Sequence, residues 1–168
     1  IMAIARRRGL AVLEDVAQAN GGRYKGRPLG AIGDAGAFSF QQFKIVTSAE
    51  GGMLVTDDRT VYERAAWKHD SALQFWRPDA ATTPFAGENY RMCELRAALG
   101  YTQLKRLAGI LERTRRLKKR IVAQLRDVPG IKLQPVNDPD GDCGIILGFY
   151  LPTAQEARRF SGALRAEG

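Results

Sequence analysis

The chain has 168 residues and a net charge of +8, and a chain of this length can bury about 70 per cent of its surface in one sizeable core. Its two cysteines lack metal or redox spacing, and its single histidine gives no basis for a histidine-rich metal site or a serine-histidine triad. No signal peptide and no apolar run near 18 residues occur, which favours a reduced, cytoplasmic setting and no membrane span.

The first half of the chain alternates short apolar segments with glycine-containing turns. In chain order it predicts a helix end over residues 1–8 closed by Gly9, a short buried strand over 10–14, a loop over 21–30, strands over 35–40 and 52–56, and a helix over 60–68. Short parallel-type strands that alternate with helices indicate an α/β layer architecture.

The second half is dominated by one long helical pattern. Residues 71–87 lack periodicity and predict an extended loop, whereas Glu94 to about Arg126 predicts a long helix with a kink near Gly109. Its apolar face is Leu95, Leu99, Leu104, Leu107, Leu111, Thr114, Leu117, Ile121 and Leu125. After Pro129-Gly130 come predicted strands over 131–133 and 144–151 and a helix over 153–167 with Thr153 as its N-cap. We expect a first domain over 1–127 and the beginning of a smaller α/β domain over 128–168.

Lys44 is the first candidate for chemistry. It ends the aromatic stretch Phe38-Ser39-Phe40-Gln41-Gln42-Phe43-Lys44, where burial of a cation is costly. Burial lowers the pKa of a lysine, and a neutral amine is a nucleophile towards an aldehyde. The alternative is an amphipathic lysine that buries its stem and keeps its charge in water.

Four motifs that occur in order around Lys44 decide between these interpretations. They are Val12-Leu13-Glu14-Asp15-Val16-Ala17-Gln18-Ala19, residues 33–40, residues 49–56 with Glu50-Gly51-Gly52, and residues 87–98. Together they resemble the DegT/DnrJ/EryC1/StrS family of sugar aminotransferases, which use pyridoxal phosphate (PLP), and the resemblance covers nearly the whole chain. It implies an α/β fold of the fold-type I PLP-dependent transferases (aspartate aminotransferase-like). Residues 1–127 would then be part of the large PLP-binding domain and its long connecting helix.

The resemblance also implies roles for five residues. Lys44 matches the family's Schiff-base lysine, which then shuttles a proton, and Asp15 matches the carboxylate that keeps the pyridinium nitrogen protonated. Gln18 matches the residue beside the ring's phenolic oxygen, and Ser39 matches a hydroxyl on the cofactor phosphate. Asn89 matches a residue that reaches the phosphate of the neighbouring subunit's cofactor, which implies a homodimer with shared active sites.

Each of these residues has an ordinary structural interpretation as well. Asp15 ends an apolar run and could cap the next turn or helix, an interpretation that we favour when it is taken alone. Gln18 and Ser39 could be loop polars, and Asn89 a turn residue before a helix. These interpretations predict no particular order among the motifs, so the joint occurrence favours the PLP interpretation.

The identity of Lys44 predicts the reaction type. Relatives with histidine at this position run dehydrations, whereas lysine indicates transamination. Glutamate or glutamine would donate the amine, and a keto-sugar or keto-cyclitol would accept it, in amino-sugar, aminoglycoside or cell-surface polysaccharide biosynthesis. Gln41 stands where members that act on nucleotide-linked sugars more often carry histidine, which favours a cyclitol.

The resemblance further predicts that the chain is a fragment of a larger protein. It opens inside a helix and ends where the family continues, and the glycine- and threonine-rich phosphate cup and the aromatic residue that stacks on the ring are missing. We therefore expect the chain by itself to bind PLP poorly and to be inactive. A non-catalytic or regulatory relative on the same fold is the first alternative function, although retention of Lys44, Asp15 and Gln18 argues against it.

A different class of function follows from charge. Residues 104–126 contain nine Lys or Arg and one acid, Glu112, and such a helix could follow a nucleic-acid backbone. The simpler interpretation is the solvated face of an amphipathic helix. No aromatic residues interleave with the charges and no nucleic-acid-binding signature accompanies them, so nucleic-acid binding is the less favoured function. His69 lies near a position where the family often has histidine, and otherwise it is a cation at a helix end.

Overall fold

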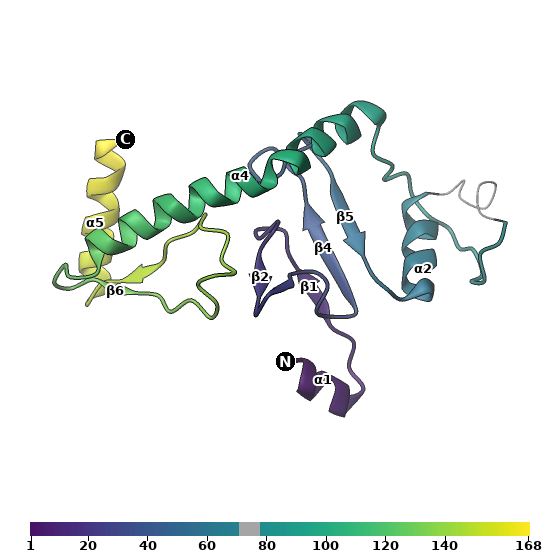
Figure 1. Ribbon diagram of the computed structural model, residues 1–168, viewed down its shortest axis with the longest axis horizontal. Helices are drawn as coiled ribbons and strands as arrows, with labels where there is room; N and C mark the ends of the chain where they lie inside the picture. The colour runs from purple at the N-terminus through teal and green to yellow at the C-terminus, as the bar shows by residue number, and fades with distance from the viewer. Residues whose placement is uncertain (71–77) are drawn as a thin grey trace.

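The structure is a computed structural model that describes residues 1–70 and 78–168 (Figure 1). Its elements are α1 (Met2–Arg8), β1 (Leu13–Asp15), β2 (Arg23–Tyr24), β3 (Arg27–Pro28), β4 (Ala35–Ser39), β5 (Gly52–Val55), α2 (Arg59–His69), α4 (Glu94–Leu125), β6 (Lys132–Leu133), β7 (Phe149–Tyr150) and α5 (Ala154–Glu167). This mixture of short strands and helices is the α/β class that the sequence predicts. Gly9 closes α1 in the left-handed conformation with φ 61°, also as predicted.

A three-stranded sheet in the order β1-β4-β5 forms the centre of the first part of the chain. β1 and β4 are parallel, with Asp15 opposite Ala37, whereas β4 and β5 are antiparallel, with Ser39 opposite Gly52. Paired residues share a face of a sheet, and successive residues alternate between faces. One face therefore carries Asp15, Ala37 and Ser39, and the other carries Glu14.

The loop before β4 covers the Glu14 face of the sheet. The Glu14 carboxylate accepts backbone hydrogen bonds from Gly30 at 3.0 Å, Ile32 at 2.6 Å and Gly33 at 2.7 Å. Burial alone raises the pKa of Glu14, but these three donors and the charge of Arg27 outweigh it, so the pKa is lowered. Glu14 thus serves the fold as an ionised anchor for the loop.

The helix α2 fastens the segment that leads towards α4. Asp58 caps α2, since its Oδ1 accepts from the backbone of Thr60 at 2.7 Å. The buried Glu63 of α2 accepts from the backbone of Thr82 at 2.9 Å, and Trp67 Nε1 donates to Thr82 Oγ1 at 2.9 Å. Residues 78–87 form no helix or strand, as predicted, and residues 71–77 of that predicted loop lie outside the described residues.

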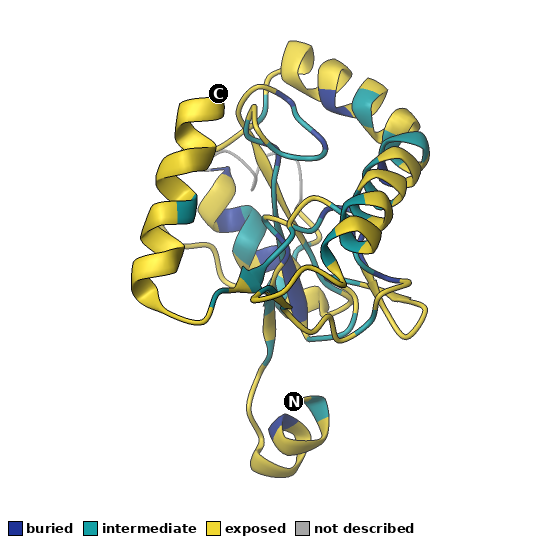
Figure 2. Ribbon diagram, turned by 90° about the vertical axis from the view of Figure 1, so that its left-hand side faces the viewer, coloured by how far each residue is buried: buried dark blue, intermediate teal, exposed yellow. Residues whose placement is uncertain are grey.

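The predicted long helix is confirmed as α4, which continues through Gly109 over 32 residues. It crosses above the sheet and reaches β6 and α5 with its C-terminal half (Figure 1). Only part of its predicted apolar face is covered, because Leu111 is buried whereas Leu95 is 84% exposed. Figure 2 shows exposed residues along most of α4 and α5. In the described part of the chain, no helix has the length and apolarity needed to cross a membrane.

Two predicted strands differ from the observed ones. The strand expected over 10–14 begins at Leu13. The backbone amide of Val12 donates to Asp34 Oδ2 at 2.6 Å, so it is not available for a hydrogen bond between strands. The burial expected there is wrong, since Leu13 is 66% exposed. The strand expected over 144–151 shrinks to β7, because Gly144 turns with φ 74° against the backbone of α4. Thr153 caps α5 as predicted, accepting from the Glu156 amide at 3.2 Å.

Candidate active site

Asp15 and Ser39 lie on the same face and at the same edge of the central sheet. Parallel strands end at the same edge, and Asp15 pairs with Ala37, two residues before Ser39. With about 4.8 Å between strands and about 3.3 Å rise per residue, the two α-carbons are about 8 Å apart. This is the carboxyl edge of parallel strands, where α/β proteins place ligands.

The connection between β4 and β5 presents Lys44. Two backbone hydrogen bonds hold the ends of this loop together: the Phe40 amide donates to Gly51 O and the Ser48 amide donates to Phe40 O, both at 2.8 Å. Val46 and Ser48 are fully buried and anchor the loop from inside. Lys44 itself is half-buried, and its amide donates to Gln41 O at 2.9 Å in a tight turn.

Lys44 and Gln18 line one cavity of about 430 Å³. The helix α4 contributes Ile110 and Thr114 to this cavity, and the chain after β6 contributes Ile145 and Ile146. The complete lining is Gln18, Phe43, Lys44, Ile45, Ile110, Thr114, Ile145 and Ile146. The structure thus brings two of the predicted residues together in a mostly apolar chamber.

Sequence reasoning missed six of the residues that line this cavity. Phe43 and Ile45 adjoin Lys44, so their position beside it was the available signal. Thr114 belongs to the predicted apolar face of the long helix, which indicated burial but no neighbour. Ile145 and Ile146 lie about a hundred residues beyond Lys44, and no local pattern connects them to it.

The buried side chain of Asn20 connects the loop after β1 to the end of β4. Asn20 is 4% exposed, and its Nδ2 donates to the backbone oxygen of Ser39 at 2.9 Å. Among the described residues, its Oδ1 has no hydrogen-bond partner. Cys143 Sγ lies 3.8 Å from Asn20 O, and burial, aided by the charge of Asp142, raises the pKa of this thiol. A buried acceptor with no donor costs stability, so this corner is suited to receive a donor.

The local interpretation of Asp15 as a cap is also present in the structure. Asp15 Oδ1 accepts from the backbone amide of Ala17 at 3.0 Å, which turns the chain out of β1. The side chain is exposed, and within the described part of the chain no hydrogen bond reaches its Oδ2. The two interpretations are therefore compatible, because one oxygen shapes the turn and the other faces outward.

Asn89 stands apart from the other candidates. It forms a bridge with Asp70 beside the end of α2, and its Oδ1 accepts from Arg91 N and Nε, each at 3.2 Å. Asn89 is exposed and does not line the cavity of Lys44. The chain thus places Asn89 outside its own candidate site.

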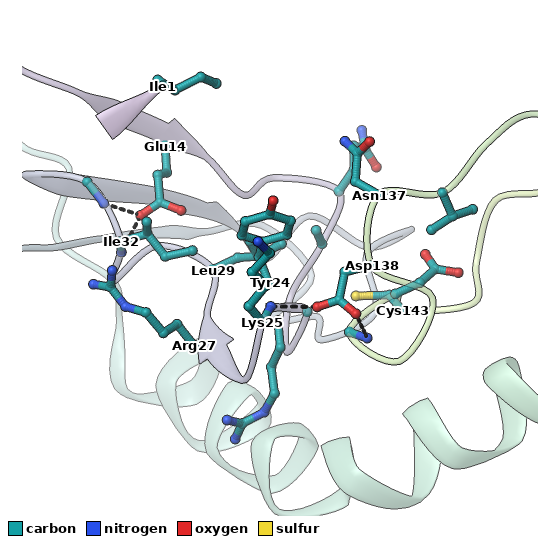
Figure 3. Close-up of a pocket in the computed structure, with 18 of the residues that line it drawn as sticks. Ile1, Glu14, Tyr24, Lys25, Arg27, Leu29, Ile32, Asn137, Asp138 and Cys143 are labelled. Carbon is teal, nitrogen blue, oxygen red and sulfur yellow. Dashed lines mark hydrogen bonds between the residues drawn. The ribbon is translucent and has the colours of Figure 1, made fainter. Parts of the chain in front are cut away.

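A larger cavity of about 920 Å³ lies next to the candidate site and shares Gln18 with it. Figure 3 shows Glu14 and Asp138 at its wall, each already bonded to backbone amides. Asp138 Oδ2 accepts from the Lys25 amide at 2.6 Å, which fastens the loop after β6 to the β2–β3 hairpin. The carboxylates of Glu14 and Asp138 are therefore occupied by the fold, whereas the smaller cavity contains Lys44 and Gln18 but neither Asp15 nor Ser39.

Comparison with known proteins places these features in a family. The DegT/DnrJ/EryC1/StrS aminotransferase family matches residues 1–166. The spore coat polysaccharide biosynthesis protein SpsC of Bacillus subtilis is 37% identical over 99% of the chain and 44% of its own length. GDP-perosamine synthase of Escherichia coli O157:H7 is 38% identical over 70% of the chain and 32% of its own length.

Solved structures share the fold. The aminotransferase TlmJ from Streptoalloteichus hindustanus superposes with a TM-score of 0.84 at 27% identity, over 99% of the chain and 45% of that protein. An E. coli GDP-4-keto-6-deoxy-D-mannose-3-dehydratase with bound hydrated PLP gives a TM-score of 0.84 at 20% identity. The superposition covers 99% of the chain and 46% of that protein. The fold-type prediction is confirmed, and the chain spans less than half the length of the relatives it matches.

Proposed function

Because the chain belongs to the DegT/DnrJ/EryC1/StrS aminotransferase family, we propose that its protein is a PLP-dependent aminotransferase of sugar metabolism. It transfers an amino group from glutamate or glutamine to a keto-sugar or keto-cyclitol. The names of SpsC and GDP-perosamine synthase support an acceptor of the sugar class in amino-sugar or cell-surface polysaccharide biosynthesis. A place in an aminoglycoside pathway is the other setting that the proposal covers.

The observation that carries this proposal is that Gln18 and Lys44 line one cavity, while Asp15 and Ser39, which do not line it, share one face and one edge of the sheet from which Gln18 and Lys44 follow in the chain. The set contains a carboxylate for a ring N–H, a hydroxyl for a phosphate, an amide for a phenolic oxygen and an amine for an aldehyde. Each polar group of PLP thus has a partner of suitable chemistry.

PLP, when bound, supplies a cationic ring that withdraws electrons from the substrate α-carbon. The Asp15 oxygen that does not serve the turn would hold the proton of the ring nitrogen, and Gln18 and Ser39 would orient the ring through its phenolic oxygen and its phosphate. Lys44 Nζ would hold the aldehyde carbon and, once released by the substrate, would carry the proton between the substrate α-carbon and C4′ of the cofactor. Ile110 of α4 and Ile145 and Ile146 give this cavity an apolar wall.

The rest of the proposal concerns the whole protein. Asn89, which is exposed and outside the cavity of its own chain, serves the cofactor phosphate of a second copy in a cytoplasmic homodimer. Residues 1–127 belong to the cofactor domain and 128–168 begin the small domain, with the stretch around Cys143 docked back on α4. Gln41 favours a cyclitol acceptor, and the chain by itself is inactive.

Borohydride trapping tests the proposed function. The full-length protein is incubated with PLP, its visible spectrum is recorded, and it is reduced, digested and analysed by mass. A pyridoxyl adduct on Lys44 supports the proposal, and screening of amino donors and keto acceptors follows. A folded protein without an adduct would mean a non-catalytic relative on this fold.

A further inference from the structure

A third cavity lies between the C-terminal half of α4 and the chain that follows β6, and it shares Ile146 with the cavity that Lys44 lines. It has a volume of about 510 Å³. In Figure 1 this part of α4 runs above β6 and the loop that leads away from it. The apolar part of its wall includes Val122, Leu133, Val136 and Leu147. The cavity therefore has a partly desolvated floor in which charge interactions are stronger than on an open surface.

Four cations of one helix face line this cavity: Arg115, Lys118, Lys119 and Arg126. At 3.6 residues per turn these positions fall within an arc of about 100°. Leu111, which is one turn before Arg115 on the same face, is buried. Arg115 and Lys118 are thus half-buried on the face with which α4 packs, where an amphipathic helix ordinarily places apolar residues, whereas Lys119 and Arg126 are exposed.

The fold neutralises only part of this charge. Arg115 Nε donates to the backbone oxygen of Asp142 at 2.6 Å, and Lys118 forms an ion pair with the Asp142 carboxylate. Among the described residues, Asp142 is the one carboxylate that lines the cavity, and neither Lys119 nor Arg126 has an ion-pair or hydrogen-bond partner there. Like charges gathered on a concave surface repel one another, so the cavity is poised to receive an anion.

We propose that this cavity binds a small organic anion that carries two linked phosphate groups. One phosphate monoester brings about 1.5 to 2 negative charges, which is less than the three positive charges that Asp142 leaves uncompensated, whereas a diphosphate matches them. Lys119 and Arg126 are about 10.5 Å apart along the helix axis, so their long side chains reach the anion from opposite ends. The apolar floor accommodates the organic part of the ligand. This inference does not depend on the proposed transamination.

Titration calorimetry with inorganic pyrophosphate, at low ionic strength, tests the site in the purified full-length protein. We expect one site per chain, weaker binding of inorganic phosphate, and a dissociation constant that rises by about tenfold or more in the Lys119→Gln/Arg126→Gln variant. The matched control is Arg106→Gln/Arg113→Gln, which removes the same charge from the opposite face of α4 and should leave the affinity unchanged.

Three results would overturn the site. They are the absence of pyrophosphate binding, an equal loss in both double variants, and a loss in Ser39→Ala, which would place the anion at the proposed cofactor phosphate site. A short DNA duplex is titrated in parallel. Binding of the duplex without binding of pyrophosphate would identify the basic face as a nucleic-acid surface and would also refute the proposal.

Discussion

Thr114 Oγ1 donates a hydrogen bond of 2.6 Å to the backbone oxygen of Cys143. The same hydroxyl lies 3.2 Å from Ile110 O and 3.1 Å from Leu111 O in its own helix. One side chain of α4 therefore holds the segment that brings Ile145 and Ile146 into the cavity of Lys44.

Replacement of Thr114 by valine is expected to lower the free energy of unfolding by about 1 to 2 kcal/mol, because Cys143 O loses its donor while the volume stays similar. Chemical denaturation measures this loss. Thr102→Val is the control, since within the described residues Thr102 Oγ1 bonds only Ala98 O of its own helix, at 2.9 Å, and its replacement should change stability by less than about 0.5 kcal/mol. Equal effects of the two substitutions would show that the contact with Cys143 contributes nothing.

Glu63 predicts a pH dependence of stability. The guanidinium of Arg59, above all, and the amides of Thr82 and Ala81 lower the pKa of this buried carboxyl to about 2 against the opposing effect of burial. A pKa below the ordinary value of 4.5 means that the contribution of Glu63 is fully present above about pH 4.5. It declines as the pH falls from there towards about 2.

Denaturation of the native chain and of Glu63→Gln at several pH values checks this expectation. The stability difference between the two should be constant at neutral pH and shrink in acid. Glu112→Gln is the control, because Glu112 is exposed and lies 4.0 Å from Arg116 in a surface ion pair, which contributes little to stability. A difference that grows on acidification would contradict the assignment.

The sequence predictions succeed where an element depends on residues that are close together in the chain. The helix α4 and the Thr153 cap depend on neighbours a few residues away, and a periodic pattern or a short motif records them. The edge that Asp15 and Ser39 share connects residues about 24 apart, and the sequence predicted parallel-type strands but not this edge.

Long-range packing accounts for what the sequence could not predict. Ile145 reaches the cavity because Gly144 turns in a left-handed conformation so close to Arg115 that a Cβ would lie 2.6 Å from its backbone nitrogen. No local pattern in residues 143–146 shows which partner they meet. Likewise, apolar composition predicted burial of Leu13, yet burial depends on a covering element that composition does not name.

Replacement of Lys44 by alanine should reduce transamination by the full-length protein by about 10³-fold or more, because both the bond to the cofactor and the proton transfer are lost. The fold should be retained, since Lys44 is half-buried and its side chain makes no hydrogen bond in the described part of the chain. Lys132→Ala, which removes an exposed lysine in β6, is the control. Activity and circular dichroism are measured together, and a fully active Lys44 variant would refute the mechanism.

Asp15→Asn separates the two roles of Asp15. Asparagine retains an Oδ1 that accepts from the Ala17 amide, and it is as good a cap as aspartate, so the thermal unfolding midpoint should stay unchanged. A neutral amide cannot keep a ring nitrogen protonated, so kcat should fall by about 10²-fold or more. Asp15→Ala removes both roles and should lower stability as well, by about 1 kcal/mol. Unchanged kcat in Asp15→Asn, together with a drop in stability in Asp15→Ala, would instead assign Asp15 to the turn alone, and its second oxygen would then have no part in catalysis.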